Sequence, residues 1–354
     1  MADDPDRVPA SAGDMRDSDE EIEFWAPIEL TPCVPIADAF DKVDADALEH
    51  QRWHRRLTMG ATLAGGISVL SSVWELGFGQ LVPAMENWLF WIGIVSLVGL
   101  VVSIGLGLWK ERKHRWLVNR HKAELYRLLR FEFVIHPGIW LKGADAGKAW
   151  VSERIAAIKA IGGRPALEES IERALLPEEE SEPPRVPVAT MRKLVEYYLS
   201  KRLNPQKEYL ANRAQKNAFW DGWLVRNVTT GMLILSVLAS LVQMAINLTG
   251  PNEHTLRNVI FATLGAASLP ALAAMVRSLR MAYEFSRNRS RFMAAHDALS
   301  QLEKRLTHHL LWSKSEPGTE DTAVMLHDLQ TSEALLRSEH QEWLRLMLEA
   351  EWFG

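Results

Sequence analysis

The sequence of 354 residues contains a single cysteine, Cys33. One cysteine excludes an intrachain disulfide framework and any zinc site that needs several thiolates. Because Cys33 lies in the short apolar stretch 24–35, we expect it to be a small buried side chain and not a nucleophile. His50 and His54 share a helix face, but no third ligand has matching spacing. The sequence therefore predicts no metal site and no cofactor.

Motifs that carry common enzyme chemistry are also missing. There is no Walker loop, no glycine-rich dinucleotide fingerprint, no His-Glu-x-x-His zinc motif and no Gly-x-Ser-x-Gly elbow. The sequence shows no convergent group of His, Asp, Glu and Cys residues either. We therefore predict that the protein is not an enzyme.

Charged side chains are missing from four long stretches, namely Leu57–Trp74, Trp88–Trp109, Asn227–Asn252 and Asn258–Val276. Each reaches the roughly 18 residues that a helix needs to cross a hydrocarbon core of about 30 Å. The sequence therefore predicts an all-α integral membrane protein with four transmembrane helices, arranged as two hairpins with long cytoplasmic helices. The expected spans are about 57–76, 88–109, 228–248 and 258–276. Because these runs carry no charge, proton-relay pumps and charge-coupled transporters are excluded.

Basic residues flank both predicted hairpins at their outer ends. They gather at 52–56 and 110–115 around the first hairpin, and at 213–226 and 277–291 around the second, whereas the links 75–87 and 249–257 contain one arginine between them. Loops that stay in the cytoplasm carry the excess of lysine and arginine. The first residues are acidic and the first apolar run begins only at Leu57, so we expect no signal peptide. Both termini and the central segment are therefore predicted to be cytoplasmic.

The chain divides into two similar halves. Trp53 and Arg56 precede the first hairpin as Trp223 and Arg226 precede the second, so the repeat spans about 170 residues. The predicted organisation is a disordered acidic tail (1–23), a first hairpin unit (24–135), a cytoplasmic helical region with a linker (136–205), a second hairpin unit (206–312) and a C-terminal cytoplasmic helix (320–354). In that last helix an apolar residue recurs every seven positions at Leu329, Leu336 and Trp343, a pattern that favours packing against another helix.

Polar residues of the third predicted span form one stripe at helical spacing, made of Thr229, Ser236, Ser240, Gln243 and Asn247. Such a stripe lines a water-filled pathway when several helices bring their stripes together. The alternative is hydrogen bonding between helices of a packed bundle. Both interpretations stay open from the sequence alone.

Small residues predict where the spans pack. They occur four residues apart at Ala61 and Gly65 in the first span, and at Gly99, Ser103 and Gly107 in the second. Small side chains at this spacing allow helix backbones to approach closely. Pro270 in the fourth span removes a backbone hydrogen bond, which predicts either a gating hinge or a plain bend.

The chain resembles the SLATT family, the SMODS- and SLOG-associating two-transmembrane effector domains of prokaryotic conflict systems. The resemblance rests on Gln51-Arg-Trp-His-Arg-Arg56, on the two-helix hairpin, and on Ala123-Glu-Leu125 with Arg127-Leu-Leu-Arg130 in the exit helix. The second half matches more loosely, through Asn217-Ala-Phe-Trp220 and its own hairpin. The chain thus looks like two SLATT units in tandem. The resemblance implies a pore-forming effector of anti-phage defence, switched on by nucleotide signalling.

These observations lead to two functional hypotheses of different classes. In the first, the protein is a bacterial inner-membrane effector whose homo-oligomers form a pore or ion-leak pathway, activated by a cytoplasmic nucleotide-sensing or nucleotide-synthesising partner. In the second, it is a non-conducting membrane anchor or scaffold for a cytoplasmic partner. The basic flanks favour contact with anionic headgroups of the lipid bilayer, and we expect no nucleic-acid partner.

Overall fold

A computed structural model of the chain describes Met15 and residues 31–78, 82–109, 112–173, 186–249, 261–283, 285–312 and 319–349. These residues form helices and contain no strand. The chain separates into two compact units. Unit 1 consists of Met1–Gln51, Lys113–Arg213 and Arg291–Glu351, and unit 2 consists of Arg52–Arg112, Ala214–Ser290 and Trp352–Gly354.

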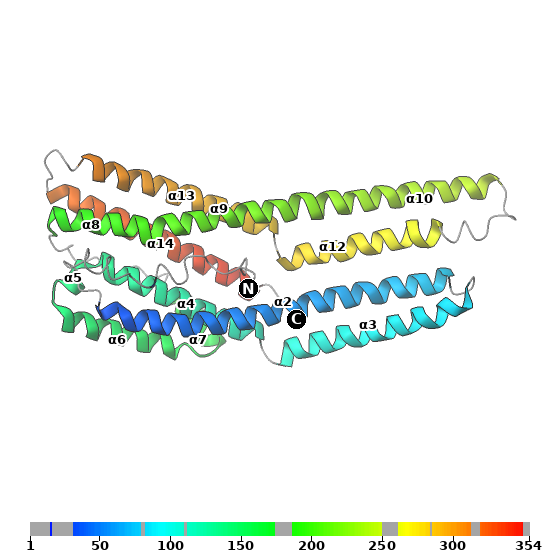
Figure 1. Ribbon diagram of the computed structural model, residues 1–354, viewed down its shortest axis with the longest axis horizontal. Helices are drawn as coiled ribbons and strands as arrows, with labels where there is room; N and C mark the ends of the chain where they lie inside the picture. Colours follow the sequence, from blue (N-terminus) through cyan, green and yellow to red (C-terminus); the bar gives the residue numbers. More distant parts are fainter. Residues whose placement is uncertain are drawn as a thin grey trace. The chain divides into compact units, whose positions relative to one another are not determined.

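Unit 2 contains the apolar helices. They are the second part of α2 (Val34–Phe78), α3 (Pro83–Trp109), the π-helical turn η3 (Trp220–Val228), α10 (Thr229–Thr249), the π-helical turn η4 (Phe261–Ser268) and α12 (Leu269–Tyr283). In Figure 1, α2 lies beside α3, and α10 lies beside α12. α10 packs along both η4 and α12.

Three stretches of the described chain are long and apolar enough to cross a membrane: Thr31–Gly77, Met85–Gly107 and Val225–Val242. Large apolar side chains on these helices are exposed, Trp88, Val95 and Leu238 among them, as a lipid-facing surface requires. The predicted fourth span, 258–276, begins outside the described residues. Its described part is divided between η4 and the 15-residue α12, which ends in a basic segment, and it is not among the three candidates.

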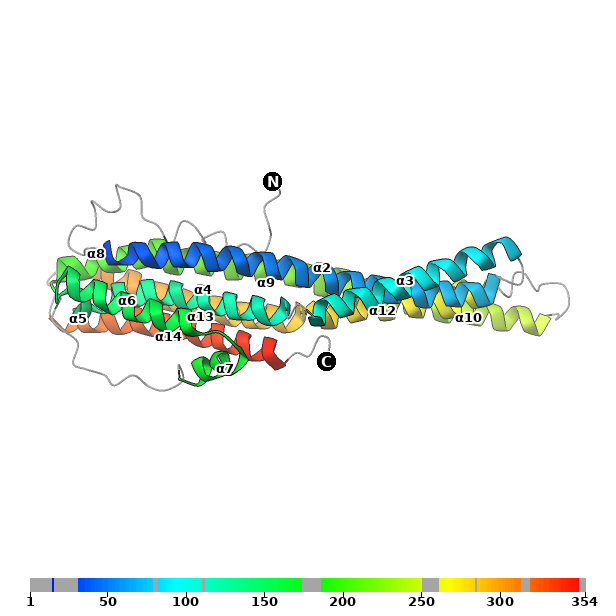
Figure 2. The ribbon, with the colours of Figure 1, turned by 90° about the horizontal axis from the view of Figure 1, so that it is seen from below.

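Unit 1 is a bundle of polar and amphipathic helices. Besides the first part of α2, it contains the short turn η1 (Thr31–Cys33), nearly all of α4 (Arg112–Ile135), α5 (Pro137–Trp140), α6 (Ala144–Ala160), α7 (Arg164–Arg173), α8 (Val188–Tyr198), the π-helical turn η2 (Leu199–Leu203), the first part of α9 (Asn204–Phe219), most of α13 (Phe285–Trp312) and α14 (Thr319–Glu349). α13 and α14 run antiparallel, because Arg291 pairs with Glu339 and Arg305 pairs with Asp328 (Figure 2).

Several local features of unit 1 follow the sequence pattern. Cys33 is buried in the core, as expected for a small apolar side chain. α4 ends at Ile135, directly before His136-Pro137, because the residue before a proline disfavours helical backbone. Leu329 and Leu336 of the seven-residue row are buried in the core, which confirms that this face of α14 packs against other helices.

The first helix differs from the expectation. The first predicted span covers about 57–76, whereas α2 begins at Val34 and continues without a break to Phe78. Pro35 fits this start, since a proline in the first turn loses no hydrogen bond. Residues 24–30 lie outside the described part of the chain.

The acidic tail 1–23 was predicted to be disordered, and Met15 departs from that expectation. Its side chain is fully buried in the core of unit 1. Met15 is the one large apolar residue between positions 9 and 21, so it supplies apolar surface that the rest of that stretch lacks. The other residues of the tail lie outside the described chain.

Candidate functional site

The predicted polar stripe on α10 does not face a single environment. Thr229 is half-buried, Ser236 is buried and Ser240 is exposed. The Ser240 hydroxyl donates to the backbone carbonyl of Ser236, four residues earlier, at 2.9 Å. The side chains of Gln243 and Asn247 lie outside the described part of the structure. Within one chain, the described part of the stripe therefore runs from a packed surface to an exposed one.

Hydroxyl groups elsewhere in unit 2 are satisfied in the same way. Thr58, Thr62 and Ser72 each donate to the carbonyl four residues earlier, over 2.9 to 3.0 Å. In a hydrocarbon environment this bond removes the cost of an unpaired hydroxyl. These side chains therefore need neither a partner helix nor water.

Small residues lie where α2 and α3 approach each other. A Cβ placed on Gly65 would lie 3.7 Å from the Leu100 side chain, and one on Gly99 would lie 3.8 Å from Cβ of Ala64. Ser103 lies against Gly60, and Ala61 is buried. For Gly107 the structure gives no such contact, so its packing role stays a prediction.

A second contact joins α2 to the other hairpin of unit 2. The Trp74 indole Nε1 donates to the Ser268 hydroxyl at 2.8 Å. About two helical turns earlier on α2, Gly66 lies so close to Met275 that an added Cβ would clash with the thioether sulfur. The two predicted repeat copies therefore pack against each other through α2 and the η4–α12 segment.

Pro270 lies at the junction between the π-helical turn η4 and α12. A proline cannot donate a backbone hydrogen bond, so the helix has to change its bonding pattern near this residue. π-helical turns insert one extra residue and are frequent at functional sites. The helix thus changes from π-helical to α-helical hydrogen bonding next to Pro270. The use of Pro270 as a hinge stays a prediction.

Gly265 provides the closest approach between α10 and η4. A Cβ on Gly265 would lie 2.1 Å from Cβ of Ala239, where no flexible side chain can yield. We expect Gly265→Ala to lower the free energy of unfolding by about 1–3 kcal/mol, the usual cost of overpacking. The matched control is Gly231→Ala on α10, where no atom lies within 4 Å. Unfolding in mixed micelles checks the pair, and equal stability of the two variants would contradict the close packing.

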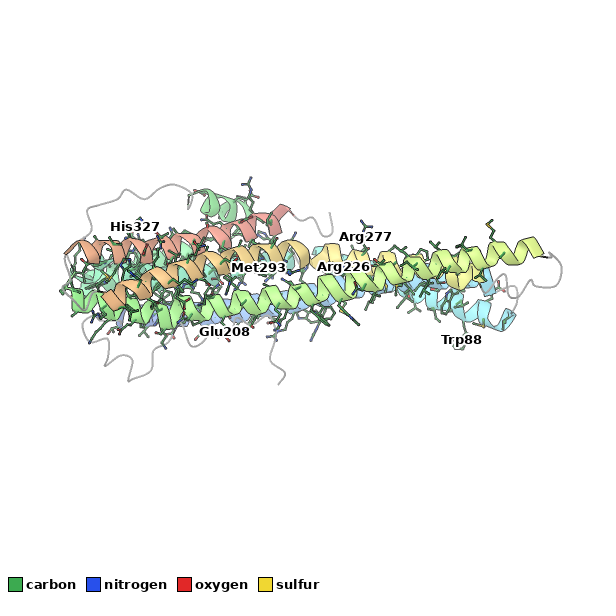
Figure 3. All side chains as sticks on the ribbon, turned by 90° about the horizontal axis from the view of Figure 1, so that it is seen from above. Trp88, Glu208, Arg226, Arg277, Met293 and His327 are labelled. Carbon is green, nitrogen blue, oxygen red and sulfur yellow. The ribbon has the colours of Figure 1, made fainter. Side chains whose placement is uncertain are left out.

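Basic residues meet at one end of the second hairpin. Arg226 on η3 and Arg277 on α12 are both exposed, and the segments that carry them are in contact. Figure 3 shows the two side chains at similar positions along the hairpin. This arrangement agrees with a hairpin whose basic ends face the same side of a membrane.

The most extensive polar network lies in unit 1, and no sequence pattern predicts it. Arg202 in η2 forms a two-pronged ion pair with Glu333 of α14, with Nε and Nη2 donating to the two carboxylate oxygens at 3.0 and 3.2 Å. The Tyr198 hydroxyl donates to the same carboxylate at 2.7 Å. All three side chains are buried. Burial and the neighbouring Glu333 carboxylate raise the pKa of Tyr198 well above its ordinary value.

A second charged group lies on α4. Glu124 accepts from Arg120 at 2.5 Å and from Arg127 at 2.8 Å, and Arg120 also donates to Asp44 of α2 at 3.2 Å. Burial alone would raise the pKa of Glu124, but the guanidinium groups of Arg127 and Arg120 hold it well below the ordinary value. The Arg127 guanidinium also lies over the Phe40 ring, 5.1 Å from its centroid.

Two histidines close the interface between α4 and α14. His121 Nδ1 and His340 Nε2 are 3.0 Å apart, and their rings are stacked with centroids 5.3 Å apart. The pKa of His121 is lowered to about 3, mainly because the ring is buried and to a smaller extent because His340 lies beside it. Burial likewise lowers the pKa of His340 to about 4, against the pull of Glu124. At neutral pH both rings are therefore uncharged, and one donates to the other.

His296 lies 175 positions after His121, close to the spacing of the predicted repeat. It is partly exposed and contacts Asp297, its neighbour in sequence. The two histidines therefore have different surroundings. Among the described residues, no group of three or more His, Cys, Asp or Glu side chains is arranged to hold a metal ion.

A scan of the chain against protein-family models gives no match, and searches of curated proteins and of solved structures give none either.

Proposed function

We propose that the chain is a multi-pass effector of the bacterial inner membrane, similar to a tandem SLATT protein. Its four spans form two hairpins, with both termini in the cytoplasm. Homo-oligomers form a pore or ion-leak pathway, and unit 1 controls that pathway in response to a cytoplasmic nucleotide-sensing or nucleotide-synthesising partner. The membrane character rests on the three exposed apolar helices.

The continuity of the helices between the two units is the observation that supports a control function for unit 1. α2 contributes its first part to unit 1 and its second part to unit 2 within 45 uninterrupted residues. The helical segment from α8 to α10 is also continuous, although π-helical turns interrupt its regular bonding. Continuous helices of this kind connect the cytoplasmic unit of the proposed effector directly to its apolar helices, which a passive tether would not require.

Assembly into oligomers is supported by the surface of α10. It exposes large apolar side chains, including Ile234, Leu238 and Leu241, as well as the hydroxyl-bearing Ser240. Two hairpins alone enclose no conducting pathway, so several copies have to bring their α10 helices together. A protein that is strictly monomeric in native membranes would contradict this part of the proposal.

Ion flux through proteoliposomes tests the pathway. We expect Ser240→Leu and Gln243→Leu to lower the flux of the wild-type protein at least tenfold, because leucine replaces the polar lining with an apolar one. Ser72→Leu is the matched control: Ser72 on α2 is exposed and donates to the carbonyl four residues earlier, as Ser240 does. Its flux should stay within twofold of wild type. Equal flux from all four proteins would contradict the pore lining.

The alternative function, a non-conducting anchor or scaffold, is favoured by one observation. Because the Ser240 hydroxyl is satisfied by its own helix, the stripe does not need a water-filled pathway. A wild-type protein that conducts no ions, even when assembled with its cytoplasmic partner, would favour this scaffold.

A further inference from the structure

Met15 occupies a socket in the core of unit 1. Its side chain is fully buried and belongs to the same apolar cluster as Phe40 of α2, Leu129 of α4 and Leu194 of α8. Methionine is flexible and polarizable, so it fills irregular apolar sites well. A residue from the acidic tail is thus part of a core that is otherwise built from helices.

The backbone of Met15 is also bound, in addition to its side chain. Arg130 of α4 is almost fully buried, and its Nη1 donates to the backbone carbonyl of Met15. Its Nη2 donates to the Tyr197 hydroxyl of α8 at 2.8 Å. One guanidinium therefore joins α4, α8 and the N-terminal segment. Recognition through a backbone carbonyl together with a side-chain pocket is the general way in which proteins bind extended peptides.

The helices around the socket are tied together without Met15. α8 and η2 are fixed to α14 through Tyr198, Arg202 and Glu333, and α4 is fixed to α14 through His121 and His340. These bonds do not involve the tail. The socket is therefore a property of the helical unit, and Met15 is its occupant.

Charge is complementary between the occupant and the helix that binds it. The sequence from Asp14 to Glu23 has six acidic residues and one basic residue. α4 (Arg112–Ile135) has seven lysines and arginines and two glutamates. Opposite net charge accelerates encounter and favours the correct partner. A single apolar anchor in such a segment allows reversible binding.

We infer that the socket beside Arg130 is a peptide-binding site, occupied by the chain's own N-terminal segment through Met15 and exchangeable for another segment of the same kind. The ligand is a methionine, or a side chain of similar size, within an acidic stretch. This inference concerns binding only and does not depend on ion conduction.

Binding of a labelled peptide to the intact protein tests the inference. The probe is a fluorescent peptide of residues 8–23, and the proteins are wild type, Met15→Asp and the control Ser18→Asp, which adds the same charge to the same tail. We expect the peptide to bind Met15→Asp at least tenfold more tightly than wild type or Ser18→Asp, because only Met15→Asp vacates the socket. A peptide that itself carries Met15→Asp should not bind. Equal binding to all three proteins, or none to any of them, would overturn the inference.

Hydrogen exchange on the wild-type protein provides a second measurement that needs no variant. The amide at Met15 should exchange at least tenfold more slowly than in the free peptide. In Met15→Asp this protection should disappear while the amides of α8 stay protected, which separates loss of docking from loss of folding. Exchange at Met15 as fast as in the free peptide, in the wild-type protein, would overturn the inference.

Discussion

Replacing Glu333 by glutamine lowers the free energy of unfolding of the intact protein by about 3–5 kcal/mol. Glu333 is the carboxylate partner of Arg202, and both side chains are almost completely buried. Glutamine keeps the size of the side chain but removes its charge, so the guanidinium of Arg202 stays in the core without a counterion. Removing one member of a buried ion pair typically costs this amount. Chemical unfolding in mixed micelles measures the loss.

Two further variants separate the charge from the shape. Glu303→Gln removes a carboxylate of the same type that is half-buried and pairs with Lys207, and it should cost about 1 kcal/mol or less. The triple variant Arg202→Met, Glu333→Leu and Tyr198→Phe removes all three polar partners together. Well-packed apolar replacements of buried ion pairs are often neutral, so it should be clearly more stable than Glu333→Gln. A triple variant less stable than Glu333→Gln would show that the pair is net stabilising.

Acidification destabilises the folded protein strongly between pH 6.5, the ordinary histidine pKa, and about pH 4. In this window the unfolded chain binds a proton at His121 and another at His340, whereas the folded protein keeps both rings neutral. Stability rises with pH wherever the unfolded state binds more protons, so this contribution is complete above pH 6.5 and is lost as the pH falls. Each histidine contributes about 1.4 kcal/mol per pH unit at most.

Neighbouring carboxyl groups modify this dependence at lower pH. The lowered pKa of Glu124 acts in the same direction, since protonating it costs more in the folded protein. The pKa of Glu339 is raised by burial and acts in the opposite direction. The shift of Glu339 therefore reduces the acid destabilisation that the two histidines cause, and the shift of Glu124 adds to it.

A double variant isolates the histidine pair. His121→Phe with His340→Phe keeps two stacked rings but removes both protonation sites, so stability should lose most of its dependence on pH between 6.5 and 4. At pH 7 the change should be about 1.5 kcal/mol or less, as for other swaps of similar volume. His308→Phe, at an exposed position, is the control and should leave the pH dependence unchanged. An unaltered acid slope in the double variant would contradict the buried neutral pair.

The sequence predicts those parts of the fold that depend on local pattern. The uncharged runs located the apolar helices, the seven-residue spacing in α14 located a buried face, and the Gly65 and Gly99 spacing located the α2–α3 contact. Each of these signals lies within one helix. The patterns did not predict that α2 begins as early as Val34, and they did not predict the π-helical turns.

The polar network of unit 1 could not be predicted from such patterns. Arg120, Glu124 and Arg127 recur at helical spacing, and a charged row of this kind normally marks a solvent-exposed face. The pairs that hold this buried network together join distant parts of the chain. Arg202 and Glu333 are 131 positions apart, and His121 and His340 are 219 apart. No pattern within α4 connects its charged residues to α8 or α14, because those helices lie far away in the chain.

The division of unit 1 into three chain segments has a consequence for how the protein is made. Translation produces α4 and α8, with Arg202, well before α14, and the apolar helices of the second hairpin are synthesised in between. Until α14 emerges, Arg202 has no Glu333 and His121 has no His340. The helical bundle of unit 1 therefore gains its last described helix, α14, only after the apolar helices of unit 2 have been synthesised.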